Sequence, residues 1–230
     1  MELLNRYIPQ MRLPEVGEEG QRRLFEASVL IVGCGALGSP IAMYLAGAGV
    51  GHLHLADFDT VSLSNLHRQV FFSESQTCLS KVNCLKERIL ALNSDVNVEI
   101  SECLVSRKFL DSLSRKFNMI VDAADNPATT YLLSDFCRDT ATPLSLAGVS
   151  GWTAQVFTYV PGSFTFRDVV PFPDDSQGVL PCSVTGIVGP TAAFAASLQC
   201  SEILKSLLGI ADNKSRLVCA NLLDLNFNTF

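Results

Sequence analysis

The sequence has little positive charge, no closely paired cysteines and no internal repeat, and these absences narrow its class. Of its 230 residues, 17 are Lys or Arg and 23 are Asp or Glu, so the formal net charge is −6. An acidic chain has no general electrostatic attraction for nucleic acid, and we expect no nucleic-acid partner. Only 17% of the residues are charged and 48% are apolar, which suits a continuous core and excludes a disordered chain.

The cysteines and the first residues indicate the compartment. None of the eight cysteines belongs to a C-x-x-C pair, and residues 1–10 lack the basic-then-apolar pattern of a signal peptide. Disulfide frameworks are typical of small secreted chains. We therefore expect a cytoplasmic protein whose cysteines are reduced and mostly buried.

The stretch from Ala27 to Ala56 contains no Asp, Glu, Lys or Arg. A membrane-spanning helix needs about 20 apolar residues, so the stretch is long enough to span a bilayer. Its six glycines and one proline instead favour a strand, a glycine turn, a helix and a second strand inside an α/β core. We expect no membrane partner.

Strand-like and helix-like segments alternate through the first 150 residues, after a helical lead-in over 1–27. The expected strands are 28–32, 51–57, 96–100, 119–123 and 143–147. The expected helices are 37–48, 79–93, 107–116 and 129–140. This alternation predicts a Rossmann-like α/β fold, with a mostly parallel sheet and helices on both faces.

Residues 151–230 have a different pattern. The expected elements are an antiparallel strand over 152–160, a long crossover loop over 161–183, an Ala-rich helix over 186–208 and a closing strand over 218–225. We treat 1–230 as one domain, in which 28–150 is the nucleotide-binding half.

A glycine turn follows the first expected strand and opens the next helix. Gly33, Gly35 and Gly38 form a G-x-G-x-x-G pattern, with Ala36 inside it. Glycines let the backbone approach phosphate oxygens, and the N-terminus of a helix favours anions. The pattern alone fits a dinucleotide such as NAD as well as ATP.

An acid ends the second expected strand. Asp57 stands where a carboxylate can hydrogen-bond ribose hydroxyls, and Asp59 follows two residues later. The alternative is a solvated acid in a turn. The glycine turn upstream favours the ribose role.

Polar and cationic side chains follow these acids: Asn65, Arg68 and Gln69, and then Lys81 at the start of the next helix. Singly, Arg68 and Lys81 would be ordinary surface cations. Together they favour ATP, because cations stabilise the charge that grows when a triphosphate is cleaved. A dehydrogenase has no need of them here.

Asp125 and Asn126 follow the expected strand 119–123. The carboxyl ends of parallel strands line the ligand crevice, and a carboxylate there can bind Mg²⁺ together with the phosphates of a substrate. The alternative is that one of the two residues caps the helix that begins near Pro127. The sequence leaves open which residue serves which purpose.

Together these segments resemble the ThiF/MoeB/HesA adenylyltransferases, the bacterial relatives of ubiquitin-activating enzymes. The resemblance is dense between residues 20 and 126 and reaches the C-terminal helix. It rests on GCGALGSP (33–40), YLAGAGVG (44–51), DFDTVSLSNLHRQ (57–69), Lys81, VDAADN (121–126) and CSVTGIVGP (182–190).

The resemblance implies an enzyme that binds Mg-ATP and adenylates the C-terminal Gly-Gly carboxylate of a small ubiquitin-like sulfur carrier. Thiamine biosynthesis is the expected pathway, and molybdopterin biosynthesis is the alternative. By matching position, Asp57 would hold the ribose and Asp125 the magnesium. Asn65, Arg68 and Lys81 would hold the phosphates.

The resemblance also implies partners. Family members are homodimers in which an arginine of one subunit reaches the phosphates of the other. The carrier tail would enter beside the crossover loop in the C-terminal half, 151–230. Cys182 would then be placed to capture the activated carrier, or else it is a small buried hydrophobe.

Some positions depart from the family pattern. Pro9 stands at the usual position of the arginine that crosses between subunits, so Arg6 or Arg12 would have to replace it, or the enzyme would be slow. Thr130 stands where an arginine is common. Many members hold a structural zinc with two C-x-x-C pairs; both are missing, and we expect no structural zinc.

Pro9 and Thr130 keep open the class of a non-catalytic partner subunit. Because a fold does not fix function, an enzyme of the same fold that adenylates a small molecule or a tRNA is a further alternative. An NAD dehydrogenase is the least favoured, because no acid–base residue for hydride transfer stands in an expected place.

Overall fold

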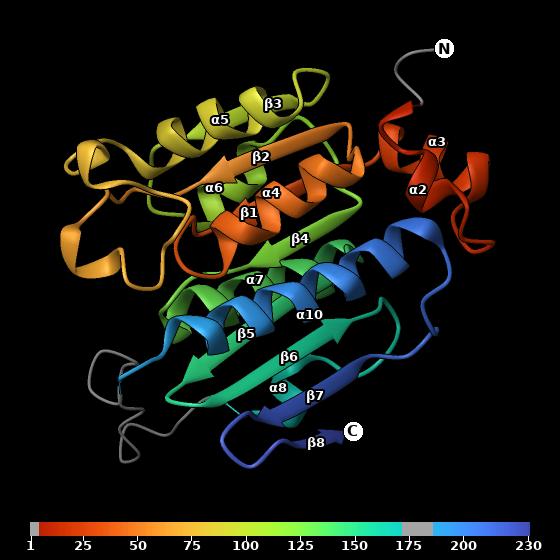
Figure 1. The fold of residues 1–230 in the computed structure, drawn as a ribbon. Coiled ribbons are helices and arrows are strands. Elements are labelled where there is room, and N and C mark those ends of the chain that lie inside the picture. Colours follow the sequence, from red (N-terminus) through yellow and green to blue (C-terminus); the bar gives the residue numbers. More distant parts are fainter. Residues whose placement is uncertain (1–4, 172–185) are drawn as a thin grey trace.

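The computed structural model describes residues 5–171 and 186–230, which form an α/β fold around one mixed sheet (Figure 1). The strand order is β3-β2-β1-β4-β5-β6-β7-β8. The strands are β1 (Ser28–Val32), β2 (His52–Ala56), β3 (Asn97–Ser101), β4 (Met119–Asp122), β5 (Leu144–Ser150), β6 (Thr153–Tyr159), β7 (Arg216–Asn221) and β8 (Asn226–Thr229). The pairs from β3 to β5 are parallel, and the pairs from β5 to β8 are antiparallel.

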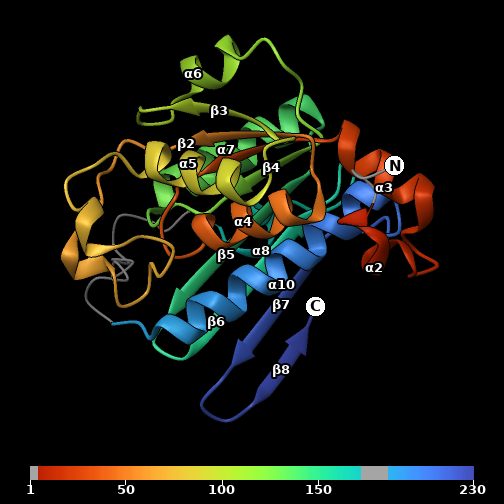
Figure 2. The ribbon, with the colours of Figure 1, turned by 45° about the horizontal axis from the view of Figure 1, so that its top comes forward.

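Helices cover both faces of this sheet (Figures 1 and 2). They are α2 (Ile8–Met11), α3 (Gly17–Glu26), α4 (Gly38–Ala48), α5 (Lys81–Leu92), α6 (Arg107–Ser112), α7 (Pro127–Thr140), α8 (Phe166–Val169) and α10 (Gly189–Leu208), with short 3₁₀ turns at Leu63–Asn65 and Glu74–Gln76. The Rossmann-like architecture predicted from the alternation of segments is confirmed. In the part of the chain described, no helix is long and apolar enough to cross a membrane.

Burial on both faces explains why the central strands are continuous apolar runs. In β1, Val29 and Ile31 join the core under α4, α5 and α10, while Leu30 and Val32 join the core on the side of α6 and α7. Successive side chains of a strand point to opposite faces, so a strand between two helical layers needs apolar residues at every position.

The two ends of the sheet have different neighbours. The strands β1, β2 and β4 all end at one edge, where Val32 pairs with both Ala56 and Asp122. The N-terminal helices α2 and α3 lie at the opposite edge (Figure 1). The edge where the strands end is therefore the one that can carry a nucleotide site.

Several predicted boundaries were wrong. The helix expected over 107–116 ends at Ser112, because Leu113 and Phe117 turn back into the core. The closing strand expected over 218–225 is β7, followed by a turn and the additional strand β8. Asn221 makes this turn, since its side-chain oxygen accepts a hydrogen bond from the N–H of Leu223 at 3.0 Å.

The crossover loop expected over 161–183 contains the helical turn α8, and residues 172–185 lie outside the described part of the chain. Seven described cysteines are free thiols, and four of them are buried, as the composition predicts: Cys34, Cys84, Cys137 and Cys200. Cys182 lies outside the described residues.

Candidate functional site

The glycine turn between β1 and α4 is closely packed. Gly33 has φ of 89°, a left-handed conformation that favours glycine. A Cβ at Gly38 would lie 1.9 Å from the carbonyl oxygen of Gly33, and a Cβ at Gly33 would lie 2.5 Å from the carbonyl oxygen of Ala123. Only glycine fits at these two positions. At Gly35 the nearest atom is the Nε2 of Gln69, at 3.2 Å from such a Cβ.

The turn presents a set of unused donors. Within the described residues, the backbone N–H groups of 35–38 have no hydrogen-bond acceptor. These groups lead into helix α4, which begins at Gly38 and has no charged side chain in its first turn. Free N–H groups and the positive end of the helix dipole suit an anion such as a phosphate.

Asp57 is tied to this turn. Its Oδ2 accepts the N–H of Cys34 at 2.7 Å, and its Oδ1 accepts the N–H of Asp59 at 2.8 Å. Each carboxylate oxygen has a second lone pair, so the half-buried side chain can still accept hydrogen bonds from ribose hydroxyls. The position fits the ribose role predicted from the sequence.

Asp59, the second acid of this segment, is paired with a cation of the expected phosphate site. Its Oδ2 lies 2.7 Å from the Nζ of Lys81, and the two residues form an ion pair. Lys81 is buried. Burial raises the pKa of the Cys34 thiol well above its ordinary value, the charge of Asp57 raises it further, and Lys81 lowers it. Both charges therefore lie near the glycine turn.

The segment around Arg68 forms a second wall. Arg68 donates through Nη2 to the Oδ1 of Asn65 at 2.9 Å, which holds the half-buried guanidinium close to the loop. Gln69 is buried, and its Oε1 has no hydrogen-bond partner among the described residues. The start of α10 supports this segment, because a Cβ at Gly189 would lie 2.8 Å from the carbonyl oxygen of His67.

One carboxylate and one amide follow β4, in different settings. Asn126 caps α7 by accepting the N–H of Thr129 at 2.9 Å, so the cap is Asn126, and Asp125 takes no part in capping. Asp125 is exposed, and no described residue forms a hydrogen bond or ion pair with its carboxylate. It remains available to a cation at the edge where the strands end.

Asp122, an acid of the VDAADN segment (121–126) to which the sequence assigns no role of its own, is buried. Its pKa is raised to about 6, mainly by burial and further by the neighbouring charge of Asp125. The hydrogen bonds from Thr130 and from the N–H of Ala124 lower the pKa, but burial has the larger effect. The only signal in the sequence was an acid as the last residue of an apolar strand.

The residues fit a magnesium-bound nucleotide. Among residues 5–171 and 186–230, no three His, Cys, Asp or Glu side chains are grouped so that they could hold a metal ion. Magnesium, however, is commonly bound through one or two carboxylates together with substrate phosphates and water. Asp125 meets that requirement: its carboxylate is exposed, and it follows Ala123 and Ala124, which pack against Gly33 of the turn. The expected absence of structural zinc stays a prediction.

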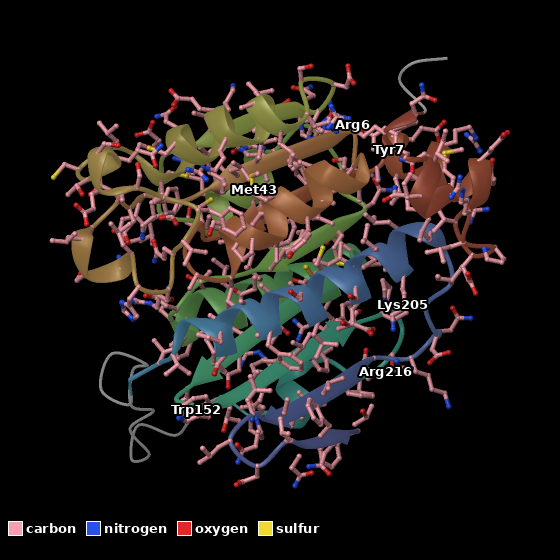
Figure 3. All side chains as sticks on the ribbon, in the orientation of Figure 1. Arg6, Tyr7, Met43, Trp152, Lys205 and Arg216 are labelled. Carbon is pink, nitrogen blue, oxygen red and sulfur yellow. The ribbon has the colours of Figure 1, made fainter. Side chains whose placement is uncertain are left out.

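The arginines expected to replace Pro9 are not near this site in the same chain. Arg6 donates to the carbonyl oxygen of Leu92 at 2.7 Å, and with Arg12 it flanks α2 at the opposite edge of the sheet (Figure 3). Cys182 lies outside the described residues, so the structure does not test it.

The strand order and the glycine turn define a Rossmann-like α/β domain. The profile of the ThiF family matches residues 7–230, and the chain belongs to that family. It is 37% identical over 222 residues to the adenylyltransferase and sulfurtransferase MOCS3 of Dictyostelium discoideum, covering 96% of this chain and 51% of that protein. It is 39% identical over 216 residues to MOCS3 of Bos taurus, covering 93% and 47%.

The chain thus spans about half the length of these relatives. A crystal structure of MccB from E. coli with ATP matches with a TM-score of 0.81 and 22% identity, covering 98% of this chain and 70% of that one. This similarity confirms the fold. The general resemblance to ThiF/MoeB-type proteins that the motifs predicted is confirmed by the family match.

Proposed function

We propose that this chain is an adenylyltransferase, which transfers AMP from ATP to the C-terminal carboxylate of a small ubiquitin-like carrier protein. The observation that carries the proposal is the site itself: the free N–H groups of 35–38 and the carboxylate of Asp57 lie where β1 and β2 end. The ion pair of Lys81 with Asp59 follows β2, and the segment of Arg68 packs against the turn through Gln69. The adenylyltransferase name of the MOCS3 relatives supports it.

In this reaction an oxygen of the carrier carboxylate attacks the α-phosphorus of ATP. The bond from that phosphorus to the bridging oxygen breaks, and pyrophosphate leaves with the electron pair, so that an acyl-adenylate forms. Arg68 and Lys81, with Asn65, would stabilise the charge on the phosphates, and Asp57 would orient the ribose. A magnesium ion held by Asp125 would neutralise phosphate charge.

The sulfur-carrier class is supported more firmly than the pathway. The relatives carry both adenylyltransferase and sulfurtransferase in their name, and they favour a molybdopterin-type carrier at least as much as a thiamine-type carrier. The expectation of thiamine biosynthesis gains no support from these relatives. We propose one adenylation domain over 1–230, whose C-terminal half receives the carrier, in a cytoplasmic protein.

A homodimer is part of the proposal. Because α2 lies at the edge opposite the nucleotide site, Arg6 and Arg12 can act only on the site of another copy (Figure 1). Arginines that complete a phosphate site from a second chain are a known device for phosphoryl-transfer enzymes.

ATP–pyrophosphate exchange tests the function. We expect exchange that depends on a carrier ending in Gly-Gly, supplied in turn as a thiamine-type and a molybdopterin-type protein. Asp125→Ala should reduce it by about 100-fold or more, as for removal of one group that stabilises transition-state charge. Asp95→Ala, an exposed acid just before β3, should leave it unchanged.

Two results would redirect the assignment. ATP binding without exchange for any carrier would favour a non-catalytic subunit, the alternative that Pro9 and Thr130 keep open, or an enzyme with another acyl substrate. Equal exchange by Asp125→Ala and the wild type would remove Asp125 from the site.

A further inference from the structure

Asp59 and Lys81 are joined through both backbone and side chain, although 22 positions separate them. The N–H of Lys81 donates to the carbonyl oxygen of Asp59 at 3.1 Å, and Thr60 and Ser80 form an isolated β-bridge beside this contact. The Nζ of Lys81 then donates to the Oδ2 of Asp59 at 2.7 Å. The loop after β2 is therefore fastened to the first residue of α5.

The ion pair matters because Lys81 is 3% exposed, whereas the side chain of Asp59 is 52% exposed. An ammonium group away from water is costly unless a carboxylate and hydrogen bonds compensate it. Among the described residues, Asp59 is the one recorded side-chain partner of this ammonium. Lys81 has three N–H donors and Asp59 takes one, which leaves two for a ligand.

The position of Asp59 is itself fixed from the glycine turn. The N–H of Cys34 donates to Asp57, and Asp57 accepts the N–H of Asp59 through its other oxygen. A chain of hydrogen bonds therefore runs from the turn through Asp57 and Asp59 to Lys81. Each link lies between 2.7 and 2.8 Å.

We infer that Asp59 is a positioning residue, which acts on the nucleotide through Lys81 and does not contact the ribose. Its ion pair with Lys81 fixes the position of the ammonium group, so that the two remaining N–H donors can reach the phosphates. The inference rests on the proposed function, because it requires that ATP occupies this site.

A double-mutant cycle on Mg-ATP affinity tests it, with calorimetric titration of the full chain by Mg-ATP. Asp59→Asn keeps the shape and removes the charge, and it should weaken binding about ten-fold, as expected when a charge-assisted hydrogen bond is lost. In a Lys81→Met background the same change should have no further effect. Asp59→Glu should restore most of the affinity, because the half-exposed position has room.

Asp111→Asn is the matched control. Its side chain is 54% exposed and pairs with Arg107 on α6, away from the site, so ATP affinity should not change. The unfolding free energy of each variant shows whether that variant folds. The second comparison is between Lys81→Met and the double variant, so it does not require the single variant Asp59→Asn to be stable.

The outcomes distinguish a failure of the inference about Asp59 from a failure of the proposed function. Losses that add in the double variant would mean that Asp59 contacts the nucleotide directly, and they would overturn the inference while leaving the proposed function intact. An Asp59→Glu variant as weak as Asp59→Asn would overturn it as well. A wild-type chain that binds no ATP would overturn the proposed function, and the inference with it.

Discussion

Asp122 lies at the end of β4 with its carboxyl removed from water, and this burial makes a quantitative prediction about stability. Its pKa is raised from 3.8 to about 6, mainly by desolvation. In the pH range between these values the unfolded chain carries a carboxylate and the folded chain a neutral acid. The stabilisation that depends on this residue is therefore complete below pH 3.8 and is lost as the pH rises through about 6.

The size of the effect follows from the two pKa values. Each pKa unit corresponds to about 1.4 kcal/mol, so the ionised carboxyl destabilises the fold by about 3 kcal/mol above pH 7. Asp122→Asn removes this cost. The amide can keep both hydrogen bonds, since its oxygen can accept the N–H of Ala124, now 3.0 Å from the carboxylate, and its NH₂ can donate to the hydroxyl of Thr130.

Denaturant unfolding at pH 4 and pH 8 measures the effect. We expect Asp122→Asn to be more stable than the wild type by about 3 kcal/mol at pH 8, and to differ little at pH 4. Asp95→Asn, an exposed acid before β3, should change the unfolding free energy little at either pH. An Asp122→Asn variant with the same stability difference at both pH values would refute the reasoning, because the cost would then not come from ionisation.

Three further predictions follow from the same structure. Gly38→Ala places a methyl group 1.9 Å from a backbone oxygen, so it should lower the unfolding free energy in a denaturant titration by about 3 kcal/mol. In the same helix, a methyl group at Gly47 meets only an ordinary contact, and Gly47→Ala should leave the unfolding free energy unchanged. Asn126→Ala removes the cap of α7 and should cost about 1 kcal/mol by thermal unfolding; no loss would show that the cap is dispensable. Burial lowers the pKa of His54 from 6.5, so the unfolding free energy falls as the pH drops below 6.5. His54→Gln should reduce this fall in unfolding free energy between pH 7 and pH 5, and a pH dependence equal to that of the wild type would contradict the prediction.

The sequence predicted most of the fold because its signals are local. The apolar runs of β1, β2 and β4 and the glycines of the turn are consecutive in the chain, and sterics alone require Gly33 and Gly38. The boundaries that were wrong depend on distant contacts. The helix α6 stops where Phe117 can pack into the core, and β8 exists because Asn221 turns the chain back.

In the candidate site, too, the features that depend on local sequence could be predicted and those that depend on distant contacts could not. The positions of Asp57, Arg68 and Asp125 could be predicted, since each follows a recognisable strand or motif. The partner of Asp59 could not, because an ion pair between residues 22 positions apart depends on how the loop after β2 folds onto α5. Likewise, the sequence could not predict that Asn126, and not Asp125, caps the helix. It could not predict the burial of Asp122 either, because both features depend on how the neighbouring helix packs.

By itself, the sequence determined the strand–turn–helix order, the glycine turn and the residue types that phosphate chemistry needs. These depend on local backbone sterics and on side-chain chemistry, which a linear chain contains in full. Only the tertiary structure decided which charges meet, which acid is buried and which edge carries the N-terminal arginines. Those properties depend on distances through space and on removal from water, and neither is a function of separation along the chain.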